Sequence, residues 1–193
     1  PTAAPSAENF RLEEVALAPL DEGQVRIKNA YLSLDPYMRG RMSDAKSYAQ
    51  PQPLNETMIG GTVGEVVESR NPAFADGDKV VGMGGWQLYS TASGRGDIRK
   101  VDTTHIPLSA YLGVVGMPGM TAWYGLNKIC EPKAGEAVCV DAASGAVGSV
   151  VGQLAKLKGC TVIGVAGGKD KCDYVTGELG FDACIDYKAH PEP

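Results

Sequence analysis

Histidine is scarce in this sequence: His105 and His190 are the two histidines among 193 residues. The five cysteines lie far apart, and no Cys-x-x-Cys pair occurs. A zinc site needs such ligands in a cluster, so we expect no metal. Scattered cysteines in odd number also disfavour a disulfide framework. We interpret them as reduced core thiols of a cytoplasmic protein. They are Cys130, Cys139, Cys160, Cys172 and Cys184.

Long apolar runs and runs of one charge are also lacking. No segment approaches the ~20 apolar residues that span a bilayer, and the first residues lack the basic and apolar regions of a signal peptide. The net charge is −5 without a basic run, which disfavours nucleic acid and membrane partners. The remaining composition, 44% hydrophobic and 21% charged, is that of a globular protein with one large or two small domains.

Glycine is abundant, at 25 residues, about twice its ordinary share, and its positions divide the first part of the chain into short strands. Apolar alternation predicts strands over 25–34, 62–68 and 79–82. Turn signals separate them at 21–23, 60–61, 76–77 and 93–94. This pattern predicts a barrel-like β domain over 1–125.

The pattern changes near residue 108. We expect a short helix over 109–112, a turn over 116–119 and a helix from 121 to 129. Strands over 138–140, 161–165 and 183–186 then alternate with helices over 147–158 and 170–179. This alternation predicts a parallel sheet, one mononucleotide-binding half of a doubly wound α/β fold, over 126–193.

Half of a doubly wound sheet leaves an open edge and uncovered apolar faces. The chain also begins with Pro1 rather than Met. We therefore expect a fragment of a longer enzyme, with obligate pairing to a second copy as the alternative.

A glycine turn follows the first strand of the parallel sheet. Gly145, Gly148 and Gly152 come between an apolar run and an amphipathic helix, with Ala143 at the usual place of a first glycine. Such a turn presents backbone N–H groups to a dinucleotide pyrophosphate. The strand and helix around it make this motif more specific than the glycine spacing alone.

The tip of the second parallel strand favours NADP(H) over NAD(H). Proteins that bind NAD usually carry an acidic residue there for the ribose 2′-hydroxyl, whereas this chain has Ala166, Gly167 and Gly168. Lys169 or Lys171 can supply charge to a 2′-phosphate. Asp170 counts against this, and an exposed lysine at a helix start is often only solvated.

Six segments resemble one enzyme family. They are Leu-Ser-Leu-Asp-Pro-Tyr-Met-Arg-Gly-Arg-Met over 32–42, Gly-Gly-Thr-Val-Gly over 60–64, Gly-Met-Pro-Gly-Met-Thr-Ala over 116–122, Ala-Ala-Ser-Gly-Ala-Val-Gly over 142–148, and the stretches 165–172 and 179–182. With them the chain resembles the zinc-independent medium-chain dehydrogenase/reductases, within them the alkenal/one reductases. That group includes prostaglandin reductases, plant double-bond reductases and bacterial curcumin reductase, whose branch is also similar around Met42 and Tyr48.

The resemblance implies a GroES-like domain followed by a Rossmann domain, with an active site in the cleft between them. It implies NADPH-dependent reduction of the carbon–carbon double bond of an α,β-unsaturated ketone or aldehyde, and a homodimer. Zinc-dependent relatives carry Gly-His-Glu where this chain has Gly-Gly-Thr over 60–62. Family members begin with an earlier strand and continue past residue 193, so this chain by itself is expected to be inactive or incomplete.

The resemblance also implies the cofactor contacts. The pyrophosphate would lie on the turn over 145–148, and Lys171 would bind the 2′-phosphate beside Tyr187 and the tip glycine, Gly167. Met117 and Thr121 match positions near the nicotinamide. The full set of expected cofactor-binding residues is Met117, Thr121, Gly145, Ala146, Val147, Gly148, Gly167, Lys171 and Tyr187.

Two tyrosines are the candidates to face the substrate. Hydride addition to the β-carbon of an enone leaves negative charge on the carbonyl oxygen, which needs a hydrogen-bond donor and later a proton. Tyr37 follows the rigid Asp35–Pro36 turn, and Tyr48 lies in a polar loop that alternatively acts as a lid. Packing is the competing interpretation for both, and for Trp86. Arg39 and Arg41 could steer a phosphate, but we interpret them as paired structural arginines. A proton from the nicotinamide ribose or water is equally compatible.

Three other functions stay open at this point. A quinone reductase of the same superfamily would also use NADPH without zinc. A crystallin-type relative would bind NADPH without turnover. An inactive NADP-binding fragment is the third.

Overall fold

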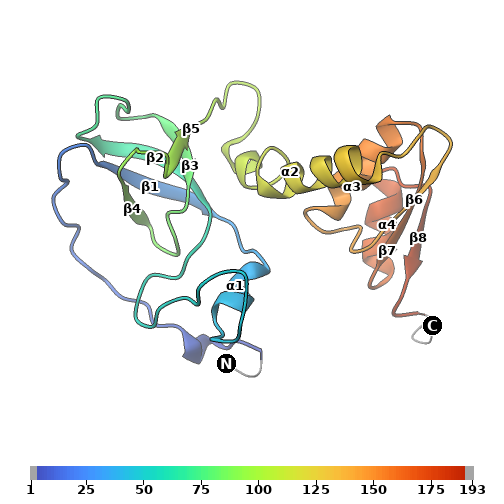
Figure 1. Cartoon of the computed structure of the whole chain (residues 1–193), viewed down its shortest axis with the longest axis horizontal. Coiled ribbons are helices and arrows are strands. Elements are labelled where there is room, and N and C mark those ends of the chain that lie inside the picture. The colour runs from blue at the N-terminus through green and yellow to red at the C-terminus, as the bar shows by residue number, and fades with distance from the viewer. Residues whose placement is uncertain (1–3, 190–193) are drawn as a thin grey trace. The chain divides into compact units, whose positions relative to one another are not determined.

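The computed structural model describes residues 4–189, so His190 lies outside the described residues. The chain forms two compact units, Pro1–Leu112 and Gly113–Pro193 (Figure 1). The domain limits expected from the sequence, 1–125 and 126–193, stay a prediction, because compactness alone does not define a domain. Each unit is described below by itself.

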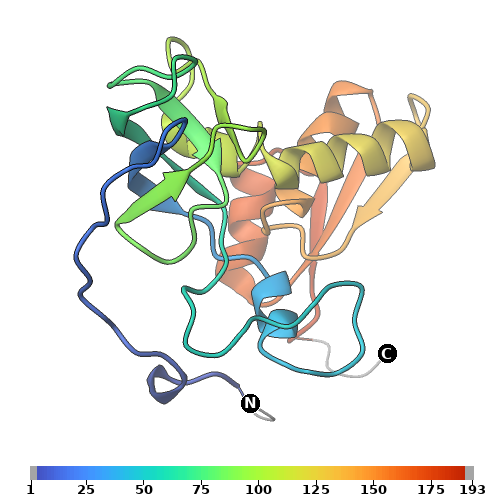
Figure 2. The ribbon, with the colours of Figure 1, turned by 60° about the vertical axis from the view of Figure 1, so that its left-hand side comes forward.

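The first unit contains a five-stranded antiparallel sheet in the order β4-β1-β2-β3-β5. Its strands are β1 (Val25–Leu32), β2 (Thr62–Ser69), β3 (Lys79–Gly82), β4 (Tyr89–Ala92) and β5 (Ile98–Lys100). Three short helical segments accompany the sheet: η1 (Ala7–Asn9), α1 (Tyr37–Arg41) and η2 (Leu108–Leu112). Between α1 and β2 the chain makes a wide excursion (Figure 2).

Alternating apolar side chains build the core of this sheet. Val25 and Ile27 on β1 pack with Val66 on β2 and Val80 on β3, all buried. The sequence predicts β1, β2 and β3, because their apolar residues alternate. It misses β4 and β5, which are three or four residues long and too short for a periodic signal. It also misses α1, expected only as a rigid turn.

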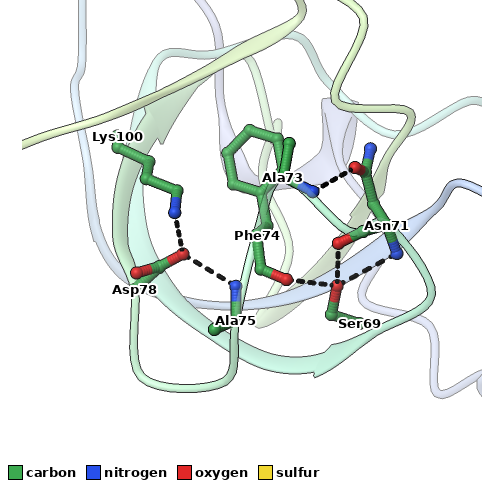
Figure 3. Close-up of polar contacts among 7 residues, drawn as sticks. All are labelled: Ser69, Asn71, Ala73, Phe74, Ala75, Asp78 and Lys100. Atoms are coloured by element: carbon green, nitrogen blue, oxygen red, sulfur yellow. Dashed lines mark hydrogen bonds and ion pairs between the residues drawn. The ribbon is translucent and has the colours of Figure 1, made fainter.

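A polar network fixes the connection from β2 to β3 (Figure 3). The Ser69 hydroxyl donates to the Phe74 carbonyl at 2.8 Å. The Asp78 carboxylate accepts the Ala75 N–H at 2.8 Å and lies 2.6 Å from Lys100 Nζ on β5. Lys100, and then the Ala75 N–H, lower the pKa of Asp78. The turn is therefore held from both of its sides.

The second unit contains a parallel sheet in the order β6-β7-β8, formed by β6 (Ala137–Val140), β7 (Thr161–Ala166) and β8 (Ala183–Asp186). The crossover helices are α3 (Gly148–Leu157) and α4 (Lys169–Gly177), and α2 (Met117–Tyr124) with the π-helical η3 (Gly125–Cys130) precedes the sheet. The expected alternation of strand and helix is confirmed. The core includes Leu126, Val140, Ala143, Ala155, Cys160, Val162, Val175 and Phe181.

The expected turn over 116–119 is wrong, because α2 begins there at Met117. Proline is favourable in the first turn of a helix, and Pro118 takes that place. Gly119 serves packing rather than a turn: a Cβ at this position would lie 1.7 Å from the Val114 carbonyl oxygen.

The expectation of core thiols is also wrong for two cysteines. Cys160 is buried, but Cys130 and Cys139 are exposed. Cys139 lies on β6, an edge strand of the described sheet, and alternate residues of an edge strand face solvent. Within residues 4–189, no helix is both long and apolar enough to cross a bilayer.

Candidate functional site

The turn between β6 and α3 is folded tightly enough to require glycine. Ala142 adopts φ = +48°, and its carbonyl accepts the Gly145 N–H at 2.8 Å. A Cβ on Gly148 would lie 2.4 Å from the same carbonyl oxygen. Because the obstacle is backbone, a side chain at position 148 would force the turn open. The two glycines therefore determine the shape of this turn.

Three successive amides at the end of this turn have no hydrogen-bond partner within the described part of the chain. Among the residues described, the N–H groups of Ala146, Val147 and Gly148 donate to no acceptor. They lie at the start of α3, a helix of ten residues. Free amides and the positive end of a helix dipole together form an anion site. The Gly145 N–H is used inside the turn, so Gly145 contributes conformation.

The tip of β7 brings together two more of the expected residues. The Tyr187 ring lies over Gly167, where a Cβ would be 2.6 Å from the phenol oxygen. Gly168, at φ = +104°, donates its N–H to the Asp186 carboxylate at 2.8 Å. This hydrogen bond is the main reason that the pKa of Asp186 is lowered. Lys171 follows on the first turn of α4.

The two lysines beside this tip differ in their partners. Lys169 forms an ion pair with Asp173, one turn further along α4, and Asp173 raises the pKa of Lys169. Lys171 is exposed and has no ion pair in the part of the chain that the structure describes. Of these two cations, Lys171 is therefore the one available to a ligand.

The two residues expected near the nicotinamide lie one turn apart on α2. The Met117 side chain is exposed. The Thr121 hydroxyl donates to the Met117 carbonyl at 2.8 Å, so it is already satisfied within its helix. The two residues thus share one face of α2.

In the first unit, Tyr37 begins α1 and is half-buried. Burial, then the charge of Asp35, raise the pKa of its phenol, and Tyr48 adds the smallest contribution in the same direction. The charge of Arg41 and a backbone hydrogen bond with Gly61 lower this pKa. The net shift is upward. Tyr37 therefore keeps its proton at neutral pH and can donate a hydrogen bond.

Tyr48 lies in the loop after α1 and is 88% exposed. Its phenol acts on the pKa of Tyr37 through electrostatics, and this is the smallest of the effects on that group. Next to Gly61, Gly60 lies under the Trp86 side chain, which stacks on Phe10 with ring centroids 5.3 Å apart. The stack explains the half-exposed state of Trp86.

Sequence reasoning missed Asp186 as an organiser of the β7 tip. An acid at the carboxyl end of a parallel strand is the signal that indicated it. Sequence reasoning interpreted Arg41 as a structural arginine, and its Nη1 donates to the Gln50 carbonyl at 2.8 Å. No group of three or more His, Cys, Asp or Glu side chains within the described range could hold a metal ion.

These features define the class of protein. A parallel sheet with a glycine turn at a helix start, following a separate antiparallel β unit, is the arrangement of a dinucleotide-binding oxidoreductase. Residues 1–101 match the family model described as the N-terminal domain of oxidoreductase. The chain belongs to this oxidoreductase family.

Individual relatives agree with this assignment. The NADPH-dependent curcumin reductase of Escherichia coli (strain K12) is 53% identical over 189 residues, which cover 98% of this chain and 54% of that protein. The NADP(+)-dependent 2-alkenal reductase of Nicotiana tabacum is 43% identical over 191 residues, covering 97% and 56%. The resemblance to alkenal/one reductases is thereby confirmed.

A solved structure agrees as well. CurA from Vibrio vulnificus in complex with NADPH superimposes with a TM-score of 0.89 at 51% identity, covering 96% of this chain and 55% of that chain. The fold is thus a GroES-like β domain and a partial Rossmann domain, as expected. The chain spans about half the length of the curated relatives it matches.

Proposed function

We propose that the protein to which this chain belongs is an NADPH-dependent reductase of the carbon–carbon double bond of α,β-unsaturated ketones and aldehydes. The single observation that carries the proposal is the row of three unpartnered amides at the start of α3. The relatives named above, a curcumin reductase and an alkenal reductase, support the substrate class.

The residues of the second unit fit the cofactor. The amides of Ala146, Val147 and Gly148 would hold the pyrophosphate, and the missing Cβ of Gly148 keeps that turn closed. Lys171 and Tyr187 would hold the 2′-phosphate beside Gly167, whose missing Cβ leaves room for the Tyr187 ring. Met117 and Thr121 would lie near the nicotinamide. Bound NADPH supplies the hydride, which in this proposal goes to the β-carbon of the enone.

Two tyrosines of the first unit would act on the substrate. Tyr37, protonated at neutral pH, would donate a hydrogen bond to the substrate carbonyl and so stabilise the negative charge that develops on its oxygen. Tyr48, exposed on its loop, would cover the substrate. The phenol hydroxyl thus takes the role that zinc has in other enzymes, and we propose that the reaction is zinc-independent.

Calorimetric titration with NADPH and with NADH tests the cofactor assignment. We expect NADPH to bind at least tenfold tighter, about 1.4 kcal/mol. The preference should be lost in K171Q and kept in K169Q, because Lys169 is already paired with Asp173. Equal affinity of the unmodified chain for both cofactors would contradict the assignment of Lys171.

An activity panel tests the substrate class. We expect NADPH oxidation with alkenals and enones, at least tenfold slower in Y37F because the donor to the carbonyl oxygen is lost. Turnover of quinones with none of enones would instead support a quinone reductase. The assay needs the full-length protein, because this chain spans about half of its relatives.

A further inference from the structure

Arg41, the last residue of α1, ties down the loop that carries Tyr48. Its Nη1 donates to the Gln50 carbonyl at 2.8 Å, and its own carbonyl accepts the Gln52 N–H at 2.7 Å. The two hydrogen bonds fasten the end of the segment 42–50 to Arg41, the residue that precedes this segment. Tyr48 belongs to the segment and comes two residues before Gln50.

Gln52 extends the same attachment to the chain before Gly60. Its side-chain oxygen accepts the Ile59 N–H at 3.0 Å, and its amide nitrogen donates to the Thr57 carbonyl at 3.3 Å. The base of the loop is thus connected from α1 to the segment that leads to Gly61, the residue hydrogen-bonded to Tyr37.

The burial of the Arg41 guanidinium has an energetic cost. Its Nε is buried and has no hydrogen-bond partner among the residues that the structure describes. A buried unpaired donor costs about 1–3 kcal/mol. Native proteins leave buried polar groups unsatisfied mostly at functional positions.

The gain that offsets this cost is a positive charge beside Tyr37. Four groups act on the Tyr37 phenol besides burial: Asp35 and Tyr48 raise its pKa, and Arg41 and the Gly61 backbone lower it. Arg41 is the single cation in this set. Without it, only the Gly61 backbone would oppose the effect of Asp35 on the pKa of Tyr37 within this set.

We propose that Arg41 is a positioning residue of this site, which fastens the Tyr48 loop to α1 and keeps a positive charge beside the Tyr37 hydroxyl. This inference rests on the proposed function. A cation near a phenol makes it the stronger hydrogen-bond donor and favours negative charge on a bound carbonyl oxygen. One side chain thereby couples the order of the loop to the acidity of the donor.

Three variants separate the two roles. R41Q removes the charge and shortens the side chain. R41K keeps the charge but loses the planar fork of the guanidinium. K46Q is the matched control, because Lys46 is an exposed cation in the same loop that does not act on Tyr37.

The first two readouts use this chain and need no turnover. Hydrogen exchange of residues 42–52 reports loop order, and ultraviolet titration of the phenols, with Y37F as reference, reports the pKa of Tyr37. We expect both R41Q and R41K to exchange at least about tenfold faster in the loop. We expect the pKa of Tyr37 to rise in R41Q and to stay unchanged in R41K.

The third readout is enone reduction by the full-length enzyme. R41Q should lower kcat at least tenfold, and R41K should mainly raise KM. R41Q indistinguishable from K46Q in loop exchange and Tyr37 titration would overturn the proposal. If R41Q does not fold, R41K decides: loop exchange equal to that of the unmodified chain overturns it. Absence of enone turnover in the unmodified enzyme counts against the proposed function alone, since the first two readouts still decide the role of Arg41.

Discussion

Replacing Gly152 by alanine should destabilise the second unit, although alanine is the better helix former. Gly152 lies within α3, and a Cβ there would be 1.8 Å from Cζ and 2.2 Å from Cε1 of Phe181. The Phe181 ring is a buried member of the core, so it has little room to move. Alanine gains about 1 kcal/mol in a helix interior, whereas overpacking costs about 1–3 kcal/mol. We expect a net loss of up to about 2 kcal/mol.

Urea unfolding followed by tryptophan fluorescence measures this loss in one unit. The chain has two tryptophans, Trp86 in the first unit and Trp123 in the second. In a W86F background the signal reports the second unit. G177A is the matched control, since a Cβ at Gly177 on α4 would meet nothing within 4 Å.

The control variant should be as stable as the parent or up to about 1 kcal/mol more stable. Adding F181L to G152A removes ring atoms from the clash and should recover part of the loss. If G152A proved as stable as G177A, the close approach of α3 to Phe181 would not be the reason for glycine at position 152.

Two further predictions concern the same unit. Asp182 accepts the Val162 N–H at 2.6 Å and pairs with Lys156 at 2.7 Å; Lys156 first, and then Val162, lower its pKa. This stabilisation is present above the unfolded pKa of about 3.9 and is lost as pH falls through the lower folded pKa. D182N should therefore lower Tm at pH 7, and its difference from the parent should disappear as acid protonates the folded Asp182 carboxylate; a difference that persists after that protonation refutes this. G148A, whose Cβ would press on the Ala142 carbonyl, should weaken NADPH binding at least tenfold by calorimetry, unlike the α4 control.

Local sequence signals were sufficient for much of the fold. The strands of the parallel sheet and its two crossover helices were predicted within one or two residues, because apolar periodicity and flanking glycines mark them. The start of α2 was mistaken for a turn, since Gly116, Pro118 and Gly119 are turn residues unless a neighbour such as Val114 packs against them. Strands β4 and β5 needed their pairing partners, β1 and β3, to be recognised.

The candidate site divides in the same way. The sequence by itself determined where a pyrophosphate and a 2′-phosphate are expected. Both signals are contiguous stretches: the glycine turn over 145–148, and the residues 166–168 at the end of β7, none of which is acidic. The spacing of Lys169 and Asp173, four residues apart on α4, also indicates locally which lysine is paired, whereas the tertiary structure decided the surroundings of Tyr37. It alone placed Arg41 beside Tyr37 and the Tyr48 loop. Charges and burial act through space rather than along the chain, and no sequence spacing records them.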